Sequence, residues 1–210
     1  MIKEKNLPQK IWWEKALIGI IFGGVTPICF FLCGWWGSYL LVPEKYIPIF
    51  AFVGLGLGLF MDVLFLRRWL HVVYYLHPII LIIIYLFYSI AIFGFFMGVP
   101  VFNTFLGPLA GFYTGRRIKA TNSPNKKSII RKVSSFTAFV LAVACLAALF
   151  LAANEQTLSS NINGMLAYTF GWKVSFNNQT ILLISILMGT AIVVLEYILT
   201  RKVASFGLDH

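Results

Sequence analysis

The stretch from Val99 to Arg117, VPVFNTFLGPLAGFYTGRR, decides the fold that this sequence predicts. Residues 99–115 carry no charge, but they are only just long enough to cross a bilayer and contain two prolines. Seven basic residues follow between Arg116 and Lys132. Because basic residues beside spans are retained in the cytoplasm, this run has to be cytoplasmic and the segment before it has to cross.

Five further apolar segments surround this one. With a cytoplasmic N-terminus, Lys45 and Lys173 are the only two of the 17 Lys and Arg residues on the outer side. So one-sided a distribution is typical of a correct assignment of spans. We therefore predict a single membrane domain over residues 1–210, an all-α bundle of six transmembrane helices with both termini cytoplasmic. The predicted spans are residues 16–36, 48–66, 78–97, 99–115, 133–153 and 180–200.

The composition excludes most other classes of protein. Apolar residues make up 60% of the chain and charged residues 11%, whereas a soluble domain carries about 25% charged residues. The net charge of +10 follows from the cytoplasmic basic residues, so we expect no nucleic-acid partner. We expect a multi-pass protein of a prokaryotic cytoplasmic (plasma) membrane.

Two connections between the spans are distinctive. The basic loop from Arg116 to Lys132 suits anionic lipid head groups, or a cytoplasmic partner that docks there. In the outer loop, Asn154 to Asn178, large and small side chains alternate from Leu166 to Phe176, which predicts a strand with one apolar face. Asn163-Gly164 before it is a turn signal. We expect this loop to lie on the membrane surface or to cover a site.

The residues that could carry catalysis are few. The chain has three histidines and three cysteines, and it contains no His-Glu-x-x-His, Gly-x-Ser-x-Gly, phosphate-loop or Cys-x-x-Cys motif. We therefore predict no catalytic residue, metal site or cofactor, and an enzyme is not the favoured reading.

Two carboxylates lie inside the predicted spans, each five residues before an arginine. Asp62 precedes Arg67, and Glu196 precedes Arg201. Ionisable groups within a span are paired or face a cavity, and they are functional candidates. We expect an intramembrane ion-pair cluster, or alternatively proton or cation coupling. The cluster would contain Asp62, Glu196, Arg67, Arg116 and Arg117.

Glycines four residues apart form stripes that let another helix approach closely. They occur at Gly19/Gly23, Gly54/Gly58, Gly94/Gly98 and Gly107/Gly111/Gly115. The last stripe belongs to the short span broken by proline, and such spans often mark ligand sites in transporters. We therefore predict a ligand site at Asn103 and Thr104 in the outer half of this span, covered by the outer loop through Tyr168 and Trp172.

In size, span number, cytoplasmic termini and apolar outer loop, the chain is similar in outline to the substrate-binding subunits of energy-coupling factor vitamin transporters. Those subunits typically carry Ala-x-x-x-Ala in the first span. Here the first span has Gly19-x-x-x-Gly23, and alanines at this spacing occur in the fifth span at Ala138/Ala142 and Ala144/Ala148. The resemblance implies an architecture only.

Three functions follow from these patterns. The first is capture or transport of a small or amphiphilic ligand from the outer side. The second is a non-catalytic subunit or assembly factor whose glycine stripes pack against another membrane protein or a second copy of the chain. The third is a membrane enzyme that acts on lipid.

Overall fold

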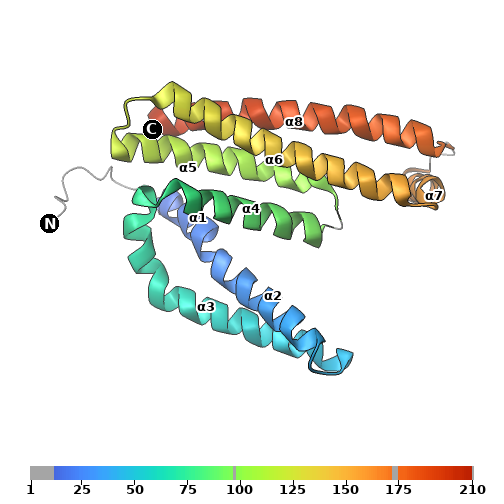
Figure 1. The fold of residues 1–210 in the computed structure, drawn as a ribbon, viewed down its shortest axis with the longest axis horizontal. Coiled ribbons are helices and arrows are strands. Elements are labelled where there is room, and N and C mark those ends of the chain that lie inside the picture. Colours follow the sequence, from blue (N-terminus) through green and yellow to red (C-terminus); the bar gives the residue numbers. More distant parts are fainter. Residues whose placement is uncertain (1–11, 97, 172–174, 210) are drawn as a thin grey trace. The chain divides into compact units, whose positions relative to one another are not determined.

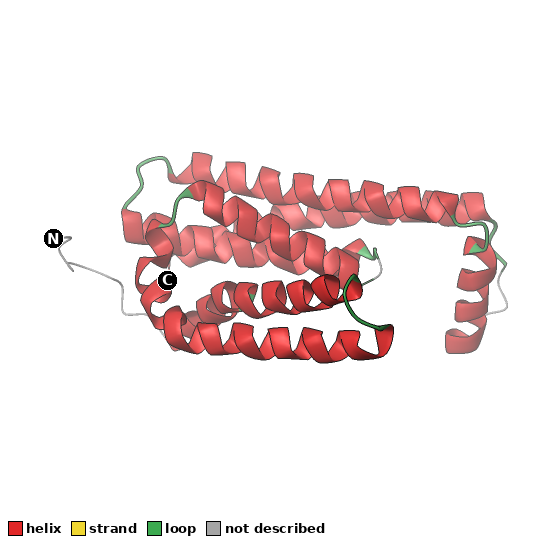
Figure 2. Cartoon of the chain, turned by 60° about the horizontal axis from the view of Figure 1, so that its bottom comes forward, coloured by secondary structure: helices red, strands yellow, loops and turns green. Residues whose placement is uncertain are grey.

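The computed structural model describes residues 12–96, 98–171 and 175–209, and over these residues it contains helices and no strand (Figures 1 and 2). The predicted all-α class is confirmed. Within the described residues, five helical segments are long and apolar enough to cross a membrane, as expected for a multi-pass membrane protein. These segments are Ala16–Tyr39, Glu44–Phe65, Pro78–Phe95, Lys126–Asn154 and Asn178–Asp209.

The chain divides into two compact units between Ile84 and Tyr85. In the first unit, α2 and α3 form an antiparallel pair whose backbones touch. A Cβ on Gly34, Gly54 or Gly58 would overlap backbone atoms of the facing helix, so these glycines permit the close approach. The elements of this unit are α1 (Trp12–Gly23), α2 (Val25–Tyr39), η1 (Glu44–Tyr46), α3 (Ile47–Val72), η2 (Val73–Tyr75) and the start of α4 (Pro78–Phe95).

Two boundaries in this unit differ from the prediction. The first predicted span is interrupted at Gly24, between α1 and α2. Pro27 follows in the first turn of α2 and has no N–H to donate to the Gly23 carbonyl, which is a recognised cause of a kink. In addition, α3 continues past residue 66, the predicted end of this span, to Val72.

In the second unit, α5 and α8 pack with their backbones in contact. A Cβ on Gly111 would overlap the Thr200 carbonyl, and one on Gly115 would overlap Ala204 and Gly207. Because residue numbers rise together along the contact, the two helices run parallel, with α6 alongside (Figure 1). The unit comprises the rest of α4, η3 (Pro100–Phe105), α5 (Leu106–Thr121), α6 (Lys126–Asn154), α7 (Leu158–Phe170) and α8 (Asn178–Asp209).

The fourth predicted span is two elements, the 3₁₀ helix η3 followed by α5. With 6 and 16 residues, and about 2.0 and 1.5 Å of rise per residue, they reach about 36 Å together, against about 30 Å of hydrocarbon. The basic loop predicted after this span is mostly helical. Its basic residues lie in the last turns of α5 and the first turns of α6, and Asn122 ends α5 in the left-handed conformation, with φ 48°.

The strand predicted in the outer loop is wrong. Residues 158–170 form α7, and the supposed turn at Asn163-Gly164 lies inside that helix. The half-buried Leu158, Ile162 and Leu166 are spaced by four, which is a helical period. The helix ends at Gly171, which adopts φ 68° and closes the last turn with N–H bonds to Leu166 and Ala167.

Candidate functional site

Glu196 is fully buried in α8, and its carboxyl group is bonded by groups from two other helices. The Tyr85 hydroxyl of α4 donates to Oε1 over 3.5 Å. The backbone N–H of Gly107 in α5 also donates to this carboxyl. The three helices thus meet at one acidic side chain in the interior of the second unit.

The start of α5 explains why a carboxyl group fits there. Gly107 is the second residue of α5, and the first N–H groups of an α-helix have no partner within it; the N–H of Leu106 donates to the Asn103 carbonyl of η3. They also form the positive end of the helix dipole, which favours a carboxylate. Gly107 is required at this point, because a Cβ would overlap the Glu196 carboxyl and the Thr200 hydroxyl.

Asn103 lies in η3, four residues before Gly107, and is 2% exposed. Its side-chain amide donates to the backbone oxygen and to the hydroxyl oxygen of Ser89, each over 2.9 Å. Ser89 is one turn beyond Tyr85 on α4, and Asn103 is four residues before Gly107. Tyr85 bonds to Glu196 and Ser89 bonds to Asn103, one helical turn further along. The Asn103 and Glu196 side chains are therefore about one turn apart, roughly 6 Å along the axis.

Each of these two side chains has an oxygen that lacks a hydrogen-bond partner among the described residues. They are Asn103 Oδ1 and Glu196 Oε2, both inaccessible to solvent. A buried acceptor left without a partner costs about 1–3 kcal/mol, and more if it is charged. Buried polar groups in folded proteins are nearly always satisfied, so these two oxygens mark a place where a ligand, ion or water belongs.

Three buried hydroxyl groups continue the network toward α6. The Thr200 and Thr137 hydroxyl oxygens are 3.2 Å apart, and Thr137 also donates to the Ser134 carbonyl. Ser134 in turn donates to Ile130. We call the linked residues the buried polar cluster: Tyr85, Ser89, Asn103, Ser134, Thr137, Glu196 and Thr200.

The structure brings Asn103 to this cluster but not the other residues of the predicted ligand site. The Thr104 hydroxyl donates to the Val101 carbonyl of its own helix. Tyr168 lies on α7 and is 94% exposed, so it does not cover Asn103. Trp172 lies outside the described residues.

The residues of the predicted ion-pair cluster belong to both units. Asp62 in α3 accepts a hydrogen bond from Thr26 within the first unit. The side chain of Arg67 lies outside the described part. In the second unit, Arg116 is nine residues after Gly107, about 14 Å along α5 from the level of Glu196. Arg116 is buried beside Gly207, and Arg117 is half-buried one residue further.

The sequence analysis missed Tyr85 and Ser89. They lie four apart in a helix whose surrounding residues are Ile, Leu, Phe and Ala, apart from Tyr88. This spacing places both on one face of α4. Two polar residues on one face of an apolar helix are the signal that could have identified Tyr85 and Ser89, because Asn103 and Glu196 required buried partners.

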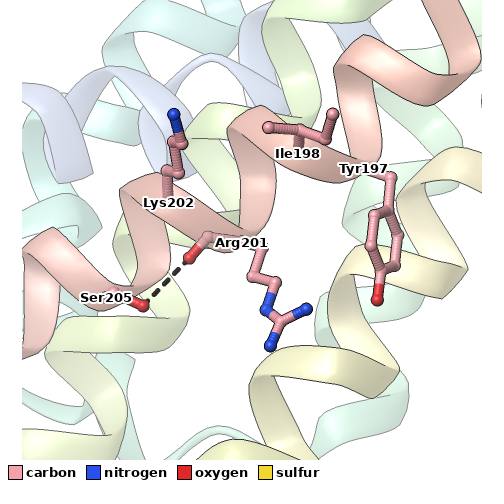
Figure 3. Close-up of a pocket in the computed structure, with 5 residues that line it drawn as sticks. All are labelled: Tyr197, Ile198, Arg201, Lys202 and Ser205. Atoms are coloured by element: carbon pink, nitrogen blue, oxygen red, sulfur yellow. Dashed lines mark hydrogen bonds between the residues drawn. The ribbon is translucent and has the colours of Figure 1, made fainter.

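A separate groove runs along the C-terminal half of α8 (Figure 3). It measures about 400 Å³, and all its lining residues come from that one helix. Ser205 donates to the Arg201 carbonyl over 3.2 Å. None of its residues belongs to the buried polar cluster. The lining residues are Tyr197, Ile198, Arg201, Lys202 and Ser205.

Comparisons with known proteins add no assignment to this geometry. No protein-family model, no curated protein and no solved structure matches the chain.

Proposed function

We propose that this protein transports a small ligand across a membrane, and that the ligand binds at Asn103 and Glu196. The observation that carries the proposal is the pair of buried oxygens in the second unit that have no hydrogen-bond partner in the described part of the chain. An ionisable group inside a span is costly to keep there, and it usually marks a pathway for a substrate or ion. The broken span η3–α5 adds to this, because interrupted helices supply free backbone groups at transporter sites.

The proposed topology has six spans and cytoplasmic termini, with η3–α5 as the fourth span. Its support is the parallel packing of α5 against α8, because spans four and six must run in the same direction in such a bundle. Entry from the outer side follows, since η3 and Asn103 then lie in the outer half. The exposed basic residues at the start of α6 would contact anionic head groups of a cytoplasmic (plasma) membrane leaflet.

The assembly-factor alternative loses part of its support. Gly54, Gly58, Gly107, Gly111 and Gly115 pack against helices of the same chain. These stripes therefore need no second protein to explain them.

Access of water to Asn103 tests transport without knowledge of the ligand. In a variant without the free cysteines at positions 29, 33 and 145, Asn103→Cys and Thr104→Cys are each exposed to a membrane-impermeant methanethiosulfonate in intact cells and in inverted vesicles. We expect labelling of both, because a transporter opens its site to water.

Phe139→Cys is the control, since Phe139 is 67% exposed on α6 and faces lipid in this topology. It should stay unlabelled from either side. Thermal melting in detergent shows that each variant is folded. If the control behaves as expected and neither test position reacts from either side, the cluster is a sealed structural network and the transport proposal fails.

A further inference from the structure

We infer that the ligand at the buried polar cluster is a small monovalent cation of the sodium class, coordinated by Glu196 Oε2 and Asn103 Oδ1. This inference rests on the proposed function and names the chemistry of the same site. It begins with the kind of atom present. Both free groups are oxygens, one a carboxyl oxygen and one an amide carbonyl oxygen, and such hard oxygen ligands are those that small, non-transition cations prefer.

The hydrogen bonds around Glu196 leave one oxygen for this purpose. Tyr85 donates to Oε1, and Oε1 is also the carboxyl oxygen that a Cβ on Gly107 would meet first. The Tyr85 hydroxyl and the Gly107 N–H hold the carboxyl group in place. They leave Oε2 as the oxygen without a partner among the described residues. A proton on Oε2 would find no acceptor among the described residues, so protonation alone leaves this atom unsatisfied.

The orientation of Asn103 is fixed in the same way. Its amide nitrogen must face Ser89, because the Ser89 carbonyl can only accept. The other end of the side chain, Oδ1, is therefore an acceptor and suits a cation rather than an anion. Thr200 adds a hydroxyl oxygen beside Gly107, close to the Glu196 carboxyl.

The net charge of the buried polar cluster determines whether a monovalent or a divalent cation fits it. Glu196 is its one acidic residue, and Asn103, Thr200 and Tyr85 are neutral. A monovalent cation would neutralise this single carboxylate in a medium that penalises net charge. A divalent cation would leave an excess positive charge, and calcium sites normally hold more than one carboxylate.

Ion-dependent stability of the purified full-length protein tests the inference. Thermal unfolding in lipid nanodiscs is measured over a series of NaCl concentrations, with choline chloride keeping the ionic strength constant. A ligand that binds only the folded state raises the unfolding temperature in a saturable way. We expect such a rise with NaCl and a smaller one with KCl. No saturable rise in the wild type overturns the inference.

Glu196→Gln is the decisive variant. Its carbonyl oxygen keeps the bond from Tyr85, but an NH₂ group replaces Oε2 and cannot bind a cation. We expect it to fold and to lose the sodium response. Thr114→Val is the matched control, because the Thr114 hydroxyl is in α5 but donates to the Ala110 carbonyl of its own helix. A sodium response that survives Glu196→Gln contradicts the inference.

Should Glu196→Gln fail to fold, Asn103→Leu provides the same test from the other ligand. The outcomes also separate this inference from the transport proposal. Labelling of Asn103→Cys without a sodium response means that the site is reached by water and takes a different ligand. A sodium response without labelling means that the cation is a sealed structural ion and that the transport proposal fails.

Discussion

Single glycines set the distance between α5 and α8. At Gly111 a Cβ would overlap the Thr200 carbonyl and the Ala204 nitrogen, which are backbone atoms and cannot rotate away. At Gly94 in α4, a Cβ would meet nothing within 4 Å. Two glycines with the same chemistry therefore have different roles, and only the tertiary contact distinguishes them.

We predict that Gly111→Ala destabilises the second unit by about 1–3 kcal/mol, the usual cost of overpacking a close contact. Thermal unfolding in detergent measures it. Gly94→Ala is the control and should be neutral or slightly stabilising, because alanine favours a helix by about 1 kcal/mol over glycine. Equal melting temperatures for both variants would show that α5 and α8 are not in backbone contact.

At the scale of the element, α7 is attached to the start of α8 mainly through asparagines. The Asn163 side chain donates to the Phe176 carbonyl and accepts from the Phe176 N–H, each over 2.9 Å. Asn178 accepts from the Ser159 N–H over 3.1 Å. In Figure 1 α7 is seen nearly end-on, at the ends of the long helices α6 and α8. Such a helix suits the membrane surface, one of the two places expected for this segment.

We predict that Asn163→Ala loosens the segment after α7, because two hydrogen bonds worth about 1 kcal/mol each are lost. Hydrogen–deuterium exchange should rise at residues 175–177 while α6 is unaffected. Asn161→Ala is the matched control, since the Asn161 side chain donates to the hydroxyl of Thr157, the N-cap of the same helix. Unchanged exchange after Asn163→Ala would mean that this side chain does not hold the segment.

At the scale of the whole molecule, the proposed topology depends on η3–α5 crossing the bilayer. Given a cytoplasmic N-terminus, its crossing puts the connection before α6 in the cytoplasm and the connection after α6 on the outer side. Asn125 and Gln156 are exposed residues in these two connections, and the first is the N-cap of α6.

We predict that Gln156→Cys reacts with an impermeant thiol reagent in intact cells and that Asn125→Cys reacts only after the membrane is opened. Both are made without the native cysteines. The charge distribution is the physical reason, because the basic residues around Asn125 are retained in the cytoplasm. Labelling of Asn125→Cys in intact cells contradicts the six-span topology.

The fold class of this protein could be predicted from its sequence. Apolar segments of about 20 residues with few charges predict membrane-spanning helices, so the all-α architecture and most helix positions could be read from hydropathy and charge. Asn103 and Glu196 could also be found, because polar residues inside a span are rare enough to be noticed. The outer loop was misjudged because alternation over a short stretch can also arise in a helix that ends at a left-handed glycine, as at Gly171.

Only the tertiary structure decided which polar groups meet. The charge pattern suggested arginine partners for Glu196, but the parallel register of α5 and α8 places Gly107 there and Arg116 about two and a half turns further along. The tertiary structure also shows which glycines contact a neighbouring helix. It shows in addition that Tyr85 and Ser89 belong to the site. Register depends on how two helix surfaces fit, a property of pairs of elements that no single segment of sequence contains.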